Sequence, residues 1–458
     1  MGTIIKTTPM QTEIGMIPED WGVGTIEQIA SKEKHSLSTG PFGSNITKDN
    51  FIPSGVPVIR VENLTAYRFL DTDFVFVSEK KADELSSSVA KANDIVVTHR
   101  GTLGQVGIVP TKGEYTRYVV SQSGMKLTCD TAKVDPHFVF YWLKSLKGQR
   151  ELLKNTSQTG VPAIAQPLSS LRKAMLPIPP LSEQQAIAKI LSDLDSKIEL
   201  NQEMNKTLES IAQAIFKHWF IDFEFPNENG EPYKSSEGEM VGSELGKIPE
   251  GWKVGKLANY VKAIKGCSYR SEDLKESNIA LVTLKSFNRG GGFNQDGYKE
   301  YVGNYGQDQI LNEGDIIIAQ TDLTQKAEVI GRDAIVNSLG KYSRLIASLD
   351  LQIVRPKESL PLNYIYYLLN NDAFHNHALS YTNGTTVLHL NKNAVSEYTI
   401  VIPPKDILER FDLCATALIK RIGVNIREND RLENIRDLLL PKLMAGKIRI
   451  PLESGNVR

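Results

Sequence analysis

The feature that most constrains the fold of this chain is a short phrase that it contains twice. "EIGMIPEDW" stands at Glu13–Trp21 and "ELGKIPEGW" at Glu244–Trp252, and six of the nine positions are identical. Two further pairs follow at offsets of 221 and 224 residues: "NDIVVT" (93–98) resembles "GDIIIA" (314–319), and "MLPIPPLSEQQ" (175–185) resembles "TIVIPPKDILE" (399–409). Drifting offsets are typical of copies that differ by loop insertions. We therefore expect two tandem copies, about residues 13–240 and 244–458.

Each copy has the same predicted anatomy, a globular part followed by a Pro-Pro pair and a long helix. Short β-rich runs such as "VPVIRV" and "DIVVT" in the first copy, and "IALVTL" and "DIIIA" in the second, are separated by turn residues. Helical patches, as at "FVFYWLKSL" and "NYIYYLLNN", alternate with them. The predicted fold class is α+β, with two globular domains separated by two long helices.

Both long helices carry a heptad seam, because apolar residues recur in steps of four and three. Capping-box starts are predicted at Ser182 with Gln185 and at Asp406 with Glu409. Arg436 departs from the apolar pattern, with Ile435 beside it as a candidate substitute. The first seam comprises Ile187, Leu191, Leu194, Ile198, Asn201, Asn205, Leu208, Ala212, Ile215 and Trp219; the second, at an offset of 224, comprises Phe411, Ala415, Leu418, Ile422, Asn425, Asn429, Leu432, Arg436, Leu439 and Leu443.

Asparagines occupy matched places in the two seams, Asn201 and Asn205 in the first and Asn425 and Asn429 in the second. A buried amide needs a partner, and Asn within a seam sets helix register at a cost in stability. We infer that the helices pair with each other, with Asn201 and Asn425 facing near the crossing point. The alternative is that each helix packs only on its own globular part. Antiparallel pairing is favoured, because the second globular part begins where the first helix ends; it implies a pseudo-two-fold axis.

The predicted boundaries follow this order of elements. Residues 1–180 form the first globular domain with its lead-in, 181–225 the central helix, 226–247 an acidic linker, 248–404 the second globular domain, and 405–458 the C-terminal helix and tail. The formal net charge is −1, but residues 24–175 carry +5 and residues 221–250 carry −6. An acidic connector therefore cancels a mildly basic domain, and the overall charge does not exclude a nucleic-acid partner.

Composition and motifs exclude several classes of protein. The three cysteines stand far apart and the chain has neither a signal pattern nor a membrane-length apolar run, so a soluble cytoplasmic protein is expected. We find no phosphate loop, dinucleotide fingerprint, metal-ligand spacing, amino-methyltransferase motif or nuclease carboxylate cluster. The sequence thus predicts a non-catalytic scaffold with no metal site and two diverged globular parts. Such a frame suits a bipartite DNA target, whose half-sites lie about 34 Å apart per helical turn.

Several stretches of the sequence, taken in order, resemble those of one known protein family. "GPFGSNI" (40–46), "VPVIRVENL" (56–64) and "THRGTLGQVGIV" (98–109) stand in the first globular part, and "LPIPPLSEQQAIAKIL" (176–191), "IFKHWFIDFEFP" (215–226) and "LLLPKLMAGKIRI" (438–450) at the helix ends. Together with the repeated phrase they resemble the specificity subunit of type I restriction–modification systems over nearly the whole chain. The second globular part departs more, since "AQTDLTQKAEVIGRDAIV" (319–336) lacks the Arg-Gly-Thr of the first.

The resemblance implies a function and a set of partners. Each globular part would be a target recognition domain that reads one half of a split double-stranded DNA sequence. The helices would set the gap and dock two methyltransferase subunits, and translocase–nuclease subunits could join. This subunit would bind no cofactor, whereas the complex would use S-adenosylmethionine, and ATP and Mg for restriction. The rival readings are a DNA methyltransferase enzyme and a coiled-coil adaptor with no DNA role.

Residues suited to base or phosphate contact stand in or beside loops that follow β-like runs. Solvated surface side chains or ion pairs are the alternative for each of them. The "IFKHWF" aromatics are either partner-binding or core residues that anchor helix to domain. The DNA-binding candidates are Arg60, His99, Arg100, Gln105, Arg117, Gln158, Thr159, Lys285, Arg289, Gln320, Lys326, Arg344 and His389; the aromatic candidates are Phe216, Trp219, Phe220 and Phe223.

Overall fold

The strands of the computed structural model repeat in the same order in two compact units. It describes residues 9–64, 69–157, 161–288, 292–322, 326–357 and 359–450. Unit 1 comprises Met1–Lys197 and Leu432–Arg458, and unit 2 comprises Ile198–Arg431. Each unit therefore combines one globular part with a portion of both long helices.

Unit 1 is built on two four-stranded sheets. One has the order β4 (Leu37–Thr39), β11 (Gly124–Leu127), β8 (Ile95–Thr98), β9 (Val106–Ile108). The other has the order β6 (Val75–Val77), β5 (Val56–Ile59), β10 (Tyr118–Val120), β7 (Val89–Ala90). Strands such as β8 are buried along their whole length, which is why they appear as unbroken apolar runs.

Unit 2 repeats both sheets strand for strand. β18 (Val261–Lys265), β26 (Leu351–Pro356), β22 (Ile316–Ala319) and β24 (Asp333–Ile335) form one sheet in that order. β20 (Lys299–Glu300), β19 (Ile279–Val282), β25 (Arg344–Ala347) and β21 (Ile310–Leu311) form the other. Positions in the two units that share a place in this order are called equivalent below. The predicted α+β tandem repeat is confirmed.

The repeated phrase forms a hairpin and a buried tryptophan in each unit. The hairpins are β1 (Pro9–Thr12) with β2 (Gly15–Pro18), and β15 (Met240–Ser243) with β16 (Gly246–Pro249). Their turns need glycine, because φ is +98° at Gly15 and +94° at Gly246. Trp21 and Trp252 follow, and both are buried. The phrase is thus architectural.

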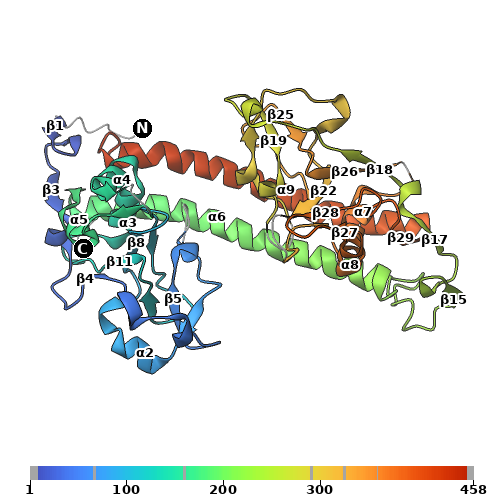
Figure 1. Cartoon of the computed structure of the whole chain (residues 1–458), viewed down its shortest axis with the longest axis horizontal. Helices are drawn as coiled ribbons and strands as arrows, with labels where there is room; N and C mark the ends of the chain where they lie inside the picture. The colour runs from blue at the N-terminus through green and yellow to red at the C-terminus, as the bar shows by residue number, and fades with distance from the viewer. Residues whose placement is uncertain are drawn as a thin grey trace, which may run out of the picture. The chain divides into compact units, whose positions relative to one another are not determined.

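Short helices join the sheets to the long ones. In unit 1 these are α1 (Ile26–Ile29), α2 (Glu79–Glu84), α3 (Pro136–Lys144), α4 (Leu146–Leu153) and α5 (Pro167–Lys173); in unit 2 they are α7 (Leu362–Leu369) and α8 (Asp372–Ser380). Within unit 1, α3 lies against α6 (Leu181–Phe216), where the Tyr141 hydroxyl donates to Asp195 at 2.7 Å, and α2 lies on the far side from α6 (Figure 1). Two outer strand pairs, β3 (Gly22–Thr25) with β14 (Met175–Ile178) and β17 (Lys253–Lys256) with β29 (Thr399–Ile402), complete the repeat.

The long helices α6 and α9 (Lys405–Met444) pair antiparallel, as predicted. In unit 2 the Asn201 amide donates to Asn429 Oδ1 at 2.9 Å and the Asn425 amide donates to Asn205 Oδ1 at 2.8 Å. The first portion of α6 meets the last portion of α9 in unit 1, where Arg436 lies 2.9 Å from Asp195. The asparagines therefore bond in the pairs 201–429 and 205–425, and not as Asn201 with Asn425, which was the expected pair.

Two local expectations about the long helices were wrong. Arg436 keeps its seam position and is buried, whereas Ile435 is exposed, because Asp195 and Asp437 neutralise the guanidinium there. The capping boxes do not form, because the helices begin at Leu181 and Lys405 and place Ser182 and Asp406 inside the first turn. The Pro180 carbonyl accepts the first helical hydrogen bonds instead, from the N–H groups of residues 183 and 184.

Each unit has its own core. In unit 1 it includes Trp21, Phe138 and Trp142, and in unit 2 it includes Trp252 and Phe411. Among the helices within the described ranges, none is both long and apolar enough to cross a membrane.

Candidate nucleic-acid interface

One edge of unit 1 gathers most of the polar candidates of the first globular part. The register pairs Thr39 with Met125, Gly124 with Thr98 and Val97 with Val106, so these strand ends lie together. His99 and Arg100 follow β8 at this edge, and Gln105 precedes β9. β5 and β10 run parallel, with Ile59 opposite Val120, so Arg60 emerges at the end of β5 beside the loop that follows β10. The edge therefore unites Arg60, His99, Arg100 and Gln105.

Backbone hydrogen bonds hold the loops of this edge together. The His99 N–H donates to the Ser123 carbonyl at 2.8 Å, and the Ser121 N–H donates to Ile59 at 2.9 Å. Gly40 approaches the Ser121 carbonyl so closely that a Cβ atom would lie 1.8 Å from its oxygen. Only glycine fits there, and Gly266 of unit 2 meets the Ser348 carbonyl in the same way, at 2.0 Å. The loops at this edge are thus fixed by the fold.

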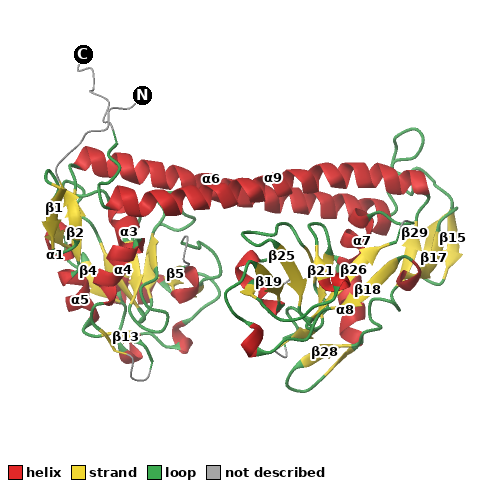
Figure 2. Ribbon diagram, turned by 90° about the horizontal axis from the view of Figure 1, so that it is seen from above, coloured by secondary structure: helices red, strands yellow, loops and turns green. Residues whose placement is uncertain are grey.

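A second hairpin packs onto the same edge in each unit. In unit 1, β12 (Thr156–Ser157) pairs with β13 (Ala163–Ile164), and the Ile164 N–H donates to the His99 carbonyl at 2.9 Å. The candidates Gln158 and Thr159 lie in the turn of this hairpin, outside the described residues. Figure 2 shows β13 at the end of unit 1 away from α6, and β28 (Leu388–Leu390) likewise in unit 2.

The equivalent edge of unit 2 carries different side chains on the same backbone bonds. The Gln320 N–H donates to the Asp350 carbonyl at 2.7 Å, as His99 does to Ser123. The Leu390 N–H donates to the Gln320 carbonyl at 2.8 Å, and His389 stands opposite Thr321 in the pairing of β28 with β23 (Thr321–Asp322). Lys285 follows β19 and is exposed. Gln320, His389 and Lys285 therefore gather at this edge.

Two candidates lie elsewhere, and a third candidate, like Gln158 and Thr159, lies outside the described residues. Arg117 and Arg344 are equivalent residues at the opposite ends of β10 and β25, away from the edge. The Arg117 guanidinium is paired with Glu79 and Asp83 on α2, and these carboxylates raise its pKa. The Arg344 guanidinium donates to the Tyr305 hydroxyl at 2.7 Å. Arg289 lies outside the described residues, and Lys326 is an exposed residue that follows a break in them.

The edge residues differ in accessibility and charge. His99 is only 7% exposed, and burial lowers its pKa against the opposing effect of a hydrogen bond that its ring donates to the Gln122 backbone carbonyl. Its Nε2 atom has no hydrogen-bond partner within the described part of the chain. Arg100 is exposed, whereas the Arg60 guanidinium lies 3.8 Å from Glu62. Arg100 is therefore available to an anionic partner, whereas His99 is buried beneath the loop.

Sequence reasoning missed two residues at these edges. Phe42, in the loop after β4, is 64% exposed, although "GPFGSNI" contributed only to the family resemblance and supplied no candidate residue. Arg332 is the equivalent of Gln105. Arg332 precedes β24, the partner of β22, and Gln105 precedes β9, the partner of β8. An aromatic residue between two glycines was an available signal for the first. The equivalence of Gln105 and Arg332 depends on strand register, which the sequence does not display.

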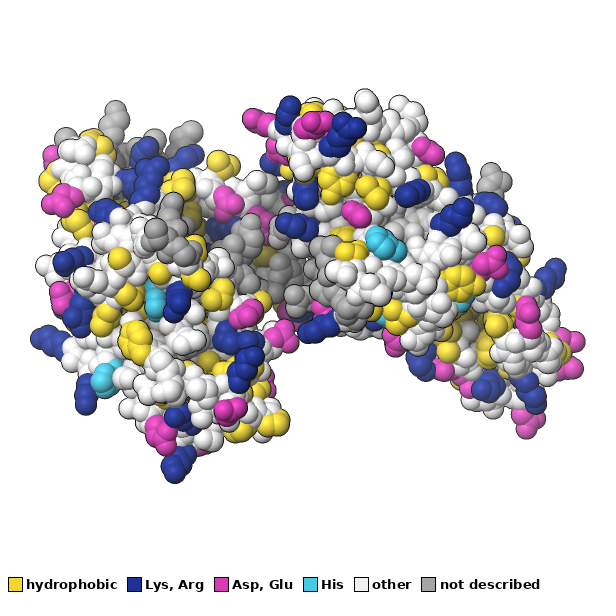
Figure 3. Space-filling view, viewed as in Figure 1, with side chains coloured by type: hydrophobic (Ala, Val, Ile, Leu, Met, Phe, Trp, Pro, Cys, Tyr) yellow, Lys and Arg dark blue, Asp and Glu magenta, His cyan; other side chains and the backbone are white. Residues whose placement is uncertain are grey.

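Charges on the visible face are mixed. In Figure 3, Lys and Arg side chains of each unit are interspersed with Asp and Glu. Among the described residues, no three His, Cys, Asp or Glu side chains are grouped so that they could hold a metal ion. The candidate interface is thus defined by its loops and by individual polar side chains.

The aromatic candidates lie in the core of unit 2. Phe216 and Phe220 are buried against Tyr364 and Phe411, and Trp219 and Phe223 are partly buried beside them. Of the two alternatives that the sequence left open, this is the packing expected of residues that anchor helix to domain.

The comparisons with known proteins agree with one another. The family model described as type I restriction modification DNA specificity domain matches this chain twice, over residues 18–210 and 249–427. The MjaIX specificity subunit of a type I restriction enzyme from Methanocaldococcus jannaschii is 28% identical, over 97% of each chain. The HindI specificity subunit from Haemophilus influenzae is 25% identical over 72% of this chain and 81% of its own. A crystal structure of a type I restriction–modification S subunit from M. genitalium, 16% identical, aligns with a TM-score of 0.52 over 92% of this chain and 96% of its own.

Proposed function

The chain belongs to the type I restriction modification DNA specificity family, and we propose that it reads a bipartite double-stranded DNA sequence with one globular part per half-site. One observation carries this proposal. The two units keep the strand order and the loop hydrogen bonds of the edge, yet the side chains there differ. Gln320 is the equivalent of His99, and Arg332 is the equivalent of Gln105. A constant frame with divergent polar side chains suits two different base sequences.

Duplicated apolar positions on the long helices support docking of two like partners. Leu200 on α6 and Val424 on α9 are matched at the offset of 224 residues, and both are exposed. Ile211 and Ile435 are matched in the same way and are also exposed. Eleven residues separate the members on each helix, about three turns, so both members share one helix face. We propose that each such face docks one methyltransferase subunit.

The catalytic groups belong, on this proposal, to the partners. The chain itself binds no cofactor, and the assembled complex uses S-adenosylmethionine, with ATP and Mg where restriction subunits join. The rival adaptor role predicts DNA binding that does not weaken with salt, because phosphate contacts release counterions and give a steep salt dependence.

Methylome mapping tests the proposal. The chain would be co-expressed with its methyltransferase subunit in a host without other adenine methylation, and methylated adenines would be mapped genome-wide. A split motif with a fixed gap is expected. Replacement of residues 248–404 with the second globular part of a relative should change one half of the motif only. A continuous motif, or a change in both halves, would contradict the proposal.

A further inference from the structure

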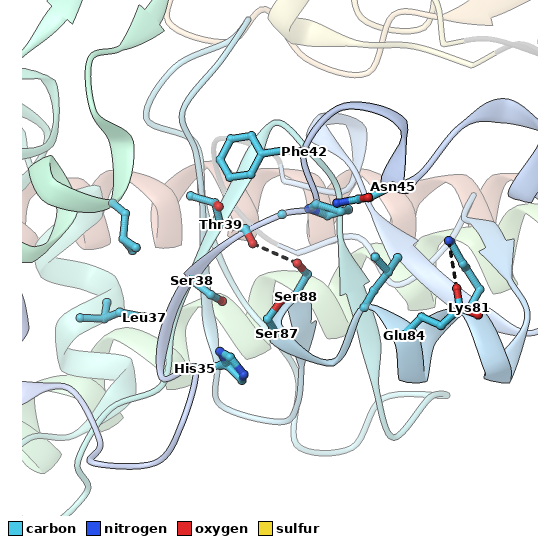
Figure 4. A pocket seen from close by; sticks show the side chains of 14 residues that line it. His35, Leu37, Ser38, Thr39, Phe42, Asn45, Lys81, Glu84, Ser87 and Ser88 are labelled. Atoms are coloured by element: carbon cyan, nitrogen blue, oxygen red, sulfur yellow. Dashed lines mark hydrogen bonds and ion pairs between the residues drawn. The ribbon is translucent and has the colours of Figure 1, made fainter.

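Unit 1 contains a pocket of about 470 Å³ beside the proposed DNA-reading edge. Its walls come from the end of β4, the loop that follows it, α2 and the turn at residues 86–88. Figure 4 shows Phe42 on one side of the pocket and His35 and Ser87 on the other. Gly40 lines the pocket and also abuts Ser121 at the edge, so the two sites are continuous.

Two side chains in this pocket are placed as if for a ligand. Ser38 is only 7% exposed, and its hydroxyl has no hydrogen-bond partner among the residues that the structure describes. A buried hydroxyl without a partner is costly to the fold. Phe42 has the opposite problem, because its ring is largely exposed on a loop fixed by Gly43 at φ +57°. A ligand that contacts both residues would give the Ser38 hydroxyl a hydrogen-bond partner and cover the Phe42 ring.

The chemistry of the lining identifies the class of ligand. The one charged pair is internally neutralised, since Lys81 Nζ donates to Glu84 at 3.1 Å, as Figure 4 also shows. The remaining polar side chains are the His35 imidazole, the Asn45 amide and the hydroxyls of Ser38, Thr39, Ser87 and Ser88. Such a lining suits a neutral, planar, hydrogen-bonding ring better than a phosphate or a metal ion. An exposed aromatic side chain next to hydroxyl and amide groups is how proteins hold an unstacked nucleobase.

Unit 2 provides an internal comparison. The equivalent of Ser38 is Ile264, a buried core residue, and the equivalent of Ser88 is Gln309. The Ser88 hydroxyl donates to the Thr39 carbonyl at 3.0 Å, and the Gln309 amide donates to the equivalent carbonyl of Lys265 at 3.2 Å. The same hydrogen bond is thus made by a longer side chain. The fold therefore does not require the polar side chain of Ser38 or the short side chain of Ser88.

We propose that this pocket binds a single purine or pyrimidine base, which stacks on Phe42 and hydrogen-bonds to Ser38 and Asn45. The base could come from two sources. One is a base turned out of the bound DNA, and for this source the inference rests on the proposed function. The other source is a free nucleoside. Both present the same ring and the same hydrogen-bonding edge.

Unit 2 also supplies the test variants. Ser88→Gln introduces the longer side chain of Gln309 while keeping its hydrogen bond, and Ser38→Ile introduces the residue found in unit 2. Gln309→Ser is the matched control, because it makes the reverse change in the other unit. Each variant would be prepared as the full chain in complex with its methyltransferase subunit, and a melting temperature within about 3 °C of wild type would show that it folds.

Two binding measurements distinguish the sources. Duplexes that carry the mapped target with a single mismatch, placed at each position of the first half-site in turn, report a base turned out of DNA. Wild type and Gln309→Ser should bind one such duplex about tenfold more tightly than the matched duplex, because the mismatch removes the cost of unpairing. Ser88→Gln and Ser38→Ile should lose this gain. Adenosine, guanosine, cytidine and thymidine report the free source, with saturable binding lost in the same two variants.

A result in either arm supports the base pocket and names its source. No mismatch gain and no saturable nucleoside binding, or a gain that persists in both Ser88→Gln and Ser38→Ile, overturns it. Specific binding of the matched duplex in the same samples would leave the proposed function intact in that case. Failure to bind the matched duplex would count against the proposed function, while the nucleoside arm would still decide on the pocket.

Discussion

The two units share a frame but place their buried charges differently. In unit 1 the Trp21 indole donates to Glu183 at 3.0 Å, and the Arg449 guanidinium bridges Glu183 at 2.7 Å and Asp20 at 2.6 Å. The matched residues of unit 2 are Ile407, Phe225 and Gly251, and there the Phe225 ring lies 5.1 Å from the Trp252 ring. Unit 1 thus has a charged clamp, formed by Glu183, Arg449 and Asp20. Unit 2 has an apolar clamp at the matched positions.

The reverse exchange occurs in the sheets. Val106 begins β9 in unit 1, and its equivalent in unit 2 is Asp333, which is buried at the start of β24. Both carboxylate oxygens of Asp333 accept hydrogen bonds from the Asn370 amide, at 3.0 and 3.2 Å. Burial nevertheless raises the pKa of Asp333 to about 7. The two units therefore share a backbone, while each of these buried polar groups has its own partners within its unit.

The largest expected effect comes from Asp333→Asn. A carboxyl with a raised folded pKa contributes stability fully below its unfolded pKa of 3.8, and loses it as pH rises through about 7. The variant cannot ionise, so its stability relative to wild type should grow between those pH values by about 4 kcal/mol. Urea unfolding from pH 4 to pH 8 measures this. A difference that does not change with pH would show that Asp333 is not buried in its acid form.

The next effect concerns the charged clamp of unit 1. Arg449→Ala leaves the Glu183 carboxylate, which is 3% exposed, without its cation, and we expect a loss of about 3 kcal/mol in the free energy of unfolding. The set Asp20→Gly, Glu183→Ile and Arg449→Phe installs the apolar version and should recover more than half of that loss. Chemical denaturation compares the two. If the triple variant is less stable than Arg449→Ala, the two clamps are not interchangeable.

A smaller effect is expected in the seam that both long helices share. Asn201→Leu leaves the Oδ1 atom of the buried Asn429 without the amide that donates to it and should cost about 2 kcal/mol. Asn201→Leu with Asn429→Leu should cost less than the sum of the single changes. A double-mutant cycle in urea gives the coupling, and additive effects would mean that the asparagine pair does not act as a unit.

The smallest effects are expected at the equivalent arginines on the opposite ends of β10 and β25. Arg117→Ala and Arg344→Ala should each change stability by less than about 1 kcal/mol, because their side chains are exposed enough for solvent to screen the pairs. Neither should change the salt dependence of DNA binding. Arg100→Ala and Lys285→Ala, at the proposed interface, should each lower that slope by about one. Equal slopes for all four variants would contradict the assignment of the interface to this edge.

The sequence by itself determined the duplication, the short strands, the long helices and their pairing. These follow from local patterns: β-rich runs between turn residues predict the strands, apolar steps of four and three predict the helix seams, and matched asparagines at Asn201 and Asn425 indicate that the helices pair. The strands predicted from "DIVVT" and "DIIIA" are β8 and β22. Local signals were sufficient wherever the structure depends on a residue's near neighbours.

The tertiary structure alone decided which candidates share a site. Arg60 and Arg117 lie beside neighbouring strands, but those strands are parallel, so the two side chains emerge at opposite edges. Hydropathy offered Ile435 as a substitute for Arg436 in the seam, yet Asp195, distant in sequence, neutralises the Arg436 guanidinium where it is buried. Strand direction, register and the partner of a buried charge are set by contacts between residues far apart in the chain, and no pattern along a single sequence records them.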